Sequence, residues 1–154
     1  MAEAHRRTSR FRLPVDKLAP HLMEAFERLD EAAEKVSLPL PLLELVRLRV
    51  SQINGCAYCV DSHNQDAREA EIPERTIAAL PVWRESPFFS DQERVALDVA
   101  EALTTMNQAP VTDELWARAA EHFTKTELAE LTWNVAIINV WNQLAGGARP
   151  WLIS

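Results

Sequence analysis

The stretch of sequence that decides the fold runs from Glu44 to His63 and reads ELVRLRVSQINGCAYCVDSH. Apolar residues recur at helical spacing before Asn54-Gly55, and this dipeptide is a strong turn signal. A second helix is expected to begin near Cys56, directly after the turn. The stretch therefore predicts two consecutive helices joined by a tight turn that folds the second helix back toward the first.

Helical patterns extend over the rest of the chain. Ser90 and Glu93, and again Thr124 and Glu127, have the spacing of a capping box, which marks the start of a helix. The chain has only 3 glycines, and a sheet protein needs more tight turns than so few glycines favour. We therefore predict an all-α domain of about six or seven helices. The expected helices cover residues 20 to 36, 40 to 53, 56 to 70, 73 to 80, 91 to 107, 113 to 122 and 125 to 145.

Apolar residues cover nearly every side of the helix expected at 125 to 145. A helix of this kind is buried in a core or in an interface. The chain also has 5 tryptophans, and a monomer of this size would struggle to bury Trp133 and Trp141 together with the apolar face between them. We expect symmetric self-association to close this surface, and we expect Gly146-Gly147 to end the helix.

The chain has 154 residues, which suits a single domain. Its net charge is -7 at pH 7, and its basic cluster is limited to the arginines of the N-terminal segment, whereas a nucleic-acid-binding protein needs a larger basic surface. No apolar run reaches the roughly 18 residues of a membrane span, and no secretory signal begins the chain. We therefore expect a cytoplasmic protein with neither nucleic acid nor membrane as a partner. We assign residues 1 to 15 to a basic arm and residues 16 to 154 to the folded domain.

Cys56 and Cys59 are the only cysteines, and they form a CxxC pair. A disulfide between them would close almost no loop, so it would add little as a structural cross-link. In a chain without an export signal, this spacing indicates redox or metal chemistry. On a helix, Cys56, Cys59 and His63 fall at i, i+3 and i+7 and share one face.

The residues around the pair supply a base for the thiols. His63 lies one turn beyond Cys59 and can take its proton near neutral pH. Cys56 lies at or near a helix N-terminus, where the helix dipole favours a thiolate. The turn at Asn54-Gly55 would bring Glu44 toward the same pocket, where a carboxylate can orient His63 and accept a proton through it or through a water.

Two other interpretations are open at this point. The two cysteines and His63 also suit zinc, with Glu44 as a fourth ligand, although structural zinc sites favour more thiolates. Alternatively, both cysteines are buried and inert. We take Tyr58, Ser51 and Asn54 as candidate pocket residues, and we expect neither a bound metal nor an organic cofactor.

The run from Glu44 to His63 resembles the core motif of the AhpD-like alkylhydroperoxidases, which belong to the carboxymuconolactone decarboxylase superfamily. The similarity extends over 20 positions, and the segment from Asn139 to Asn142 is similar to the last core helix of that family. The resemblance implies an all-helical domain that assembles into trimers or hexamers. The best-known members have a relay histidine where this chain has Tyr58, which implies a slower or differently tuned relay. The relay residues implied by the resemblance are Glu44, Cys56, Cys59 and His63.

The resemblance also implies a reaction. In that family the second cysteine attacks the peroxide and the first resolves it, which assigns attack to Cys59 and resolution to Cys56. The helix dipole alone favours Cys56 as the more acidic thiol, whereas the closeness of His63 favours Cys59. The implied protein is a thiol-dependent peroxidase that takes a hydroperoxide and is reduced again by a lipoyl or thioredoxin-like thiol protein, most accessibly at Cys56. The alternatives are a decarboxylase or lactone-processing enzyme of the same superfamily and a non-catalytic redox sensor.

Overall fold

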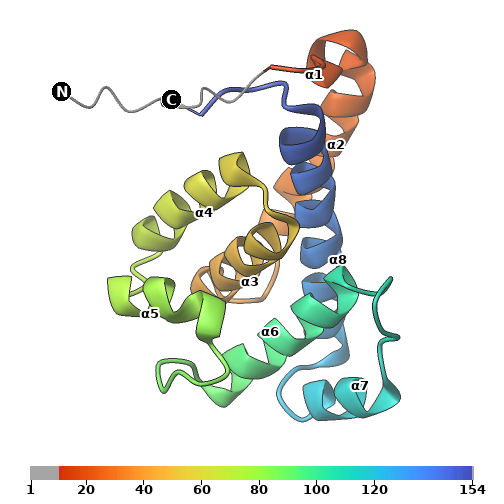
Figure 1. The fold of residues 1–154 in the computed structure, drawn as a ribbon. Helices are drawn as coiled ribbons and strands as arrows, with labels where there is room; N and C mark the ends of the chain where they lie inside the picture. The colour runs from red at the N-terminus through yellow and green to blue at the C-terminus, as the bar shows by residue number, and fades with distance from the viewer. Residues whose placement is uncertain (1–10, 154) are drawn as a thin grey trace, which may run out of the picture.

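The computed structural model describes residues 11–153, and over these residues the chain is helical with no β-strand (Figure 1). Within this part of the chain, eight α-helices, one 3-10 turn and one π-helical segment follow one another. They are α1 (Val15–Leu18), α2 (Pro20–Glu34), α3 (Leu40–Asn54), α4 (Ala57–Glu69), α5 (Glu74–Ala79), η1 (Leu80–Val82), α6 (Asp91–Thr104), α7 (Asp113–Ala120), α8 (Lys125–Asn142) and η2 (Gln143–Ala148). The prediction of an all-α domain is confirmed.

The seven expected helices correspond in order to α2 through α8. The additional helix is α1, a single turn at the boundary expected between the arm and the domain, so the described part of the chain has eight helices rather than about six or seven. Residues 1 to 10 of the arm lie outside the described residues. The end of the arm is bonded to the C-terminal segment, because the amides of Arg12 and Leu13 donate to the carbonyls of Arg149 and Ala148 at 3.2 and 3.0 Å.

Helix α3 forms the centre of the domain, and α4, α6 and α8 pack around it (Figure 1). Two apolar clusters hold these helices together. The first joins α3, α6 and α8 through Val46, Val50, Val99, Leu131, Val135 and Ile138. The second joins α3 and α6 to α4, α5 and η1 through Leu45, Leu48, Ala67, Ile77, Leu80 and Leu97. Each fully buried leucine or valine stabilises the fold by roughly 1.5–3 kcal/mol relative to an exposed position, so α3 is fixed firmly enough to position a site.

Several helix boundaries follow the local sequence. Ser90 and Thr124 begin α6 and α8 as complete capping boxes, in which the hydroxyl oxygen accepts the amide proton of Glu93 or Glu127 at 3.2 Å. Helix α3 ends at Gly55, whose φ of 64° lies in the left-handed region that glycine tolerates. The predicted turn is confirmed there, and α4 begins directly after it.

The C-terminal end of α8 differs from the prediction. Gly146 and Gly147 do not end the helix, because the chain continues after Asn142 as the π-helical segment η2. Arg149 then leaves the helix with a φ of 50°. The π-helical segment places Gly146 against Cys56, where an added Cβ would lie 3.2 Å from the cysteine Cβ. Glycine is therefore favoured here by a close approach and not by a helix stop.

Several apolar side chains of α2 and α8 face solvent in the single chain. Leu22 and Leu29, which belong to the apolar stripe of α2, are 63% and 40% exposed. Trp133 is 57% exposed, whereas Trp141 is partly buried and packs on Phe26 with ring centroids 4.9 Å apart. One chain alone therefore buries only part of this apolar surface. No helix in the described part of the chain is long and apolar enough to span a membrane.

Candidate active site

A cleft of about 920 Å³ opens between α2, α3, α4 and the C-terminal half of α8. Glu44, Cys59 and His63 line it. Glu44 comes from the beginning of α3, and the other two come from successive turns of α4. The turn at Gly55 folds α4 back along α3, so side chains from two helices that are consecutive in sequence meet at the wall of the cleft.

The carboxylate of Glu44 is hydrogen-bonded to the ring of His63, with 2.9 Å between Oε2 and Nδ1. Asp66, one turn further along α4, places Oδ2 3.2 Å from the same nitrogen. Glu44 is 3% exposed, and the side chain of His63 is 17% exposed. Two neighbouring carboxylates assign the proton of a neutral imidazole to Nδ1, which leaves Nε2 as the acceptor. The pair can therefore accept a further proton and stabilise the imidazolium that results.

Arg47 holds the other carboxylate oxygen of Glu44, although its sequence pattern was not recognised as that of a site residue. Its Nη1 donates to Oε1 of Glu44 at 2.7 Å, and its Nη2 donates to Oδ1 of Asn134 on α8 at 2.8 Å. The i, i+3 spacing of Glu44 and Arg47 was a visible signal, whereas no local pattern marks Asn134, which lies 87 residues from Arg47. These buried bonds fix the carboxylate so that one oxygen is left for His63.

The charges of this cluster determine the pKa of Glu44. Burial alone would raise that pKa, but the hydrogen bond and the charge of His63, together with Arg47, outweigh burial and lower it from 4.5. The pKa of Asp66 is instead raised, first by partial burial and then by the negative charge of Glu44. Glu44 is therefore ionised at neutral pH and presents its negative charge to His63.

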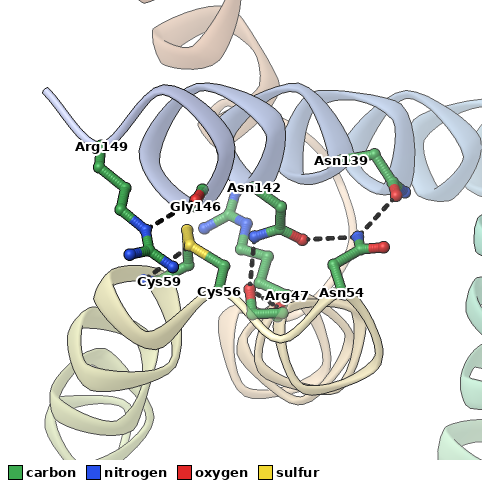
Figure 2. The surroundings of a disulfide bond; sticks show 9 residues. Arg47, Asn54, Cys56, Cys59, Asn139, Asn142, Gly146 and Arg149 are labelled. Carbon is green, nitrogen blue, oxygen red and sulfur yellow. Dashed lines mark hydrogen bonds between the residues drawn. A yellow bond between two sulfur atoms is a disulfide. The ribbon is translucent and has the colours of Figure 1, made fainter. Parts of the chain in front are cut away.

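Cys56 and Cys59 are joined by a disulfide, with their Cα atoms 5.3 Å apart (Figure 2). Cys56 is the N-cap of α4, and its sulfur accepts the amide proton of Cys59 at 3.3 Å. Both residues are buried, and of the two only Cys59 lines the cleft. Gly146 packs against Cys56, and Trp151 packs against the cluster that the two cysteines form with Ala145. The expectation that Cys56 is the more accessible sulfur for thiol exchange is therefore wrong for the oxidised protein.

Of the three candidate pocket residues, only Tyr58 lines the cleft, and its ring centroid lies 5.6 Å from that of Trp151. Ser51 and Asn54 instead bond to Asn142 at the end of α8, and Figure 2 shows the bond between Asn54 and Asn142. The hydroxyl of Ser51 accepts from Nδ2 of Asn142 at 3.0 Å, and Nδ2 of Asn54 donates to Oδ1 of Asn142 at 2.8 Å. These two residues tie the end of α3 to α8 beside the disulfide and do not face the cleft.

Glu44, His63 and Asp66 form the one group of potential metal ligands found among residues 11–153. Each offers a ligand atom within 4.8 Å of the others. Arg47 already bonds to Glu44, and its permanent positive charge opposes a cation at the same carboxylate. The two cysteine sulfurs are bonded to each other, so the interpretation of the pair as zinc ligands does not describe this state of the protein.

Comparison with known proteins establishes the family. The sequence model of the carboxymuconolactone decarboxylase family matches residues 20–102, which is more than half of the chain. The chain belongs to this family. It is also 34% identical over 134 residues to the uncharacterized protein YdfG of Bacillus subtilis (strain 168), and the match covers 87% of this chain and 91% of that protein.

Two solved structures show the same fold for this member of the carboxymuconolactone decarboxylase family. One is ATU0492 from Agrobacterium tumefaciens, a protein of unknown function whose suggested role is that of the antioxidant defence protein AhpD. It is 32% identical, with a TM-score of 0.90 over 94% of this chain and 99% of its own. The AhpD core of an uncharacterized peroxidase-related protein from Ralstonia eutropha JMP134 has a TM-score of 0.79 at 19% identity, over 91% of this chain and 75% of its own. The chain is therefore an AhpD-like member of the family, as its motif indicated.

Two walls of the cleft of this AhpD-like protein were missed by the sequence analysis. An apolar wall includes Trp141 and Trp151, and an acidic wall includes Glu27, Asp30 and Glu34 of α2. The three α2 carboxylates are spaced at i, i+3 and i+7, which was a readable signal of one charged helix face. Nothing local indicated that this face borders the cleft that contains Cys59.

Proposed function

We propose that this protein is a thiol-dependent peroxidase that reduces hydroperoxides with its CxxC pair. The observation that carries the proposal is the hydrogen bond between Glu44 and His63 in the cleft that Cys59 lines. An ionised carboxylate, an imidazole with a free nitrogen and a sulfur with a partner cysteine are the groups needed to form a thiolate and transfer its proton. Membership of the AhpD-like family supports the same chemistry.

The oxidative half of the cycle begins at Cys59 in the reduced protein. Nε2 of His63 takes the proton of the thiol, directly or through one water, while Glu44 stabilises the imidazolium. The thiolate attacks the outer oxygen of the hydroperoxide, the O–O bond breaks, and Cys59 becomes a sulfenic acid. The imidazolium returns its proton to the departing alkoxide, which leaves as the alcohol. The sulfur is oxidised by two electrons and the peroxide is reduced by two.

Cys56 then resolves the sulfenic acid. Its thiol attacks the sulfur of Cys59, water leaves, and the disulfide forms. A Cα separation of 5.3 Å lies within the range that such a bond accepts without movement of the backbone. Because Gly146 packs against Cys56 and only Cys59 lines the cleft, we place the attack of the reducing thiol at Cys59, with Cys56 as the leaving thiolate. A second thiol releases the first as a disulfide, and a lipoyl or thioredoxin-like protein is the donor we propose.

Mass spectrometry of the reduced protein before and after one equivalent of hydroperoxide tests this function. We expect both thiols to disappear together, and we expect sustained hydroperoxide consumption when a thiol reductant is in excess. Cys59→Ser should be inactive, whereas Cys56→Ser should stop at a sulfenic acid on Cys59. Two free thiols after peroxide treatment, or stoichiometric zinc in the purified protein, would contradict the proposal.

The two alternatives make different demands on the cleft. A decarboxylase or lactone-processing enzyme binds a carboxylate-bearing substrate and needs a free cation. Within the described part of the chain, the one guanidinium that lines the cleft belongs to Arg47, and it is bonded to Glu44 and Asn134. A non-catalytic redox sensor would react once with hydroperoxide, so turnover with excess reductant distinguishes it from an enzyme.

We also propose that the protein assembles into a homo-oligomer, a trimer or a hexamer. Trp133 borders a shallow apolar hollow with Trp116 and Leu128, and Leu22 and Leu29 are exposed on α2. Exposed apolar side chains of this size are normally covered by association. Light scattering behind a sizing column should give a mass three or six times that of the chain. The mass of a single chain at micromolar concentration would contradict the assembly.

A further inference from the structure

The cleft has a strongly charged side. Among its lining residues are six carboxylates, which belong to Glu27, Asp30, Glu34, Glu44, Asp66 and Glu69. The one guanidinium in the lining belongs to Arg47 and is bonded to Glu44. Among residues 11–153, no hydrogen bond or ion pair neutralises the three carboxylates that come from α2. The part of the lining that the structure describes therefore has an excess of negative charge.

The remaining wall of the cleft is apolar. It is formed by Ile137, Ile138 and Trp141 of α8, together with Trp151 and Tyr58. Cys59 belongs to the same lining, so a molecule bound in the cleft beside its sulfur is exposed to both the apolar and the acidic walls. A reactant that suits both walls has an apolar body and no negative charge.

We propose that the cleft makes Cys59 selective for neutral and cationic hydroperoxides and thiols over those that carry a carboxylate, and that Glu27, Asp30 and Glu34 impose this selectivity. The statement about hydroperoxides rests on the peroxidase function proposed above. The selectivity for thiols depends only on the disulfide and the cleft, and not on peroxidase activity. Because Cys56 lies behind Gly146, both kinds of reactant use the same entrance.

The physical basis is the concentration of charged molecules near the sulfur. A cleft lined by charges of one sign changes the association rate of a charged reactant by about tenfold or more. Glu27 and Glu34 are exposed, and salt screens such charges over about 10 Å at 0.1 M ionic strength. The selectivity should therefore be largest at low ionic strength. It acts on the approach to Cys59 and leaves the chemistry of the sulfur unchanged.

Thiol–disulfide exchange tests the inference without any peroxide. The oxidised protein is reduced with cationic cysteamine, neutral mercaptoethanol or anionic mercaptopropionate. Mass spectrometry of acid-quenched samples then measures the fraction of protein whose disulfide has reacted. Each rate is divided by the rate of the same thiol with dithiodipyridine, a small uncharged disulfide, which removes differences in intrinsic reactivity. We expect the cationic thiol to react fastest and the anionic thiol slowest, about tenfold apart at low ionic strength. The difference should disappear in concentrated salt.

Two double variants of α2 separate the cleft from the general surface charge. Glu27→Gln/Glu34→Gln removes two charges that line the cleft. Glu24→Gln/Glu31→Gln removes two exposed charges at the same spacing on the same helix that do not line it. We expect the ratio of the cationic to the anionic rate to fall about threefold in the first variant and to stay at the wild-type value in the second.

Equal normalised rates for the three thiols, equal responses of the two double variants, or no exchange with any thiol would each overturn the inference. A second arm compares a neutral alkyl hydroperoxide with a carboxylate-bearing one, and the reduced protein should consume the neutral one faster. Equal consumption of the two would overturn the inference for hydroperoxides. If neither is consumed while the order of the thiols holds, the peroxidase function fails and the charge selectivity of Cys59 stands.

Discussion

Two regions of the molecule each contain a carboxylate that accepts a hydrogen bond from an arginine of α3, and they differ in the other side chains that donate to that carboxylate. Away from the cleft, Glu101 of α6 accepts hydrogen bonds from Arg49 at 2.7 Å and from Trp83 and Arg84 at 2.8 Å. None of these donors releases its proton in the ordinary pH range. Burial alone would raise the pKa of Glu101, but the three donors outweigh it and lower the pKa. The Glu101 cluster is a fixed joint between α3, α6 and the segment after η1.

In the cleft, Glu44 has one permanent donor, Arg47, and its second oxygen bonds to His63. Histidine is the side-chain type that gains and loses a proton near neutral pH. Both carboxylates are ionised and both have a lowered pKa. The Glu101 cluster is therefore a structural ion pair, whereas the donor His63 allows the Glu44 cluster to move a proton. Variants of Glu101 should mainly lower stability, and variants of the Glu44 cluster should mainly lower activity.

The largest expected effect on activity is that of His63→Gln. Glutamine keeps a polar side chain in the cleft but cannot take the proton of Cys59, so hydroperoxide consumption should fall about 10²-fold or more. Glu44→Gln should cause a fall of similar size, while Glu101→Gln should leave the rate per folded molecule unchanged. Steady-state assays on the purified proteins measure all three. Wild-type rates in both cleft variants would show that the thiol reacts without help from Glu44 and His63.

Glu101→Gln should have the larger effect on stability. It removes the charge that compensates Arg49 and Arg84, so the free energy of unfolding should fall by about 1–3 kcal/mol. His63→Gln should change that free energy by less than about 1 kcal/mol, because the imidazole lies at the wall of an open cleft. Urea denaturation at neutral pH compares the two. Equal losses in both variants would show that the clusters do not differ as described.

Acid should weaken both clusters as the pH falls below about 4.5. A carboxyl group with a lowered folded-state pKa contributes stability above its unfolded value, here 4.5, and loses that contribution as the pH falls through the folded pKa. The free energy of unfolding should therefore decrease below about pH 4.5. In Glu101→Gln the decrease should be shallower, because one of the contributing groups is gone. Denaturation midpoints across this interval measure it, and parallel slopes would contradict the lowered pKa of Glu101.

The smallest effect is expected from Asp66→Asn. Its carboxylate lies 3.2 Å from the nitrogen of His63 that already bonds to Glu44, and a second, partly exposed partner of this kind should change the rate only about two- to fivefold. The pKa of Asp66 is raised, so its ionised form disfavours folding above that pKa, and the asparagine should not destabilise the protein at neutral pH. The same assays check both statements. A fall as deep as that of His63→Gln would make Asp66 an equal member of the relay.

Local patterns predicted most of the fold. Ser90 and Thr124 begin helices where their capping boxes indicated, because the partner of each hydroxyl lies three residues away. The turn at Gly55 brings Glu44 to His63 for a similar reason, since two helices joined by a tight turn must run back along each other. In each case the deciding residues are close together in sequence, so their spacing is sufficient.

Contacts between segments that are far apart in the sequence could not be predicted from the spacing of residues along the chain. Asn134 reaches Arg47 from α8, and Asn142 bonds to Ser51, which was expected in the pocket. Gly146 resembles a helix stop in sequence, but its approach to Cys56 depends on a π-helical turn that no local signal marked. That approach also reverses the expected order of accessibility of the two sulfurs.

Because Trp151 packs against the cluster that contains the cysteine pair, its fluorescence should report the redox state of the protein. The indole packs against the cluster of Cys56, Cys59 and Ala145, and its ring centroid lies 5.9 Å from that of Trp141. A disulfide accepts an electron from an excited indole at contact and quenches its emission, whereas a thiol quenches less. Reduction should therefore brighten the intrinsic fluorescence, and peroxide should dim it again. A stopped-flow fluorimeter can follow each half of the cycle in the unlabelled protein, and Trp151→Phe identifies the reporting indole.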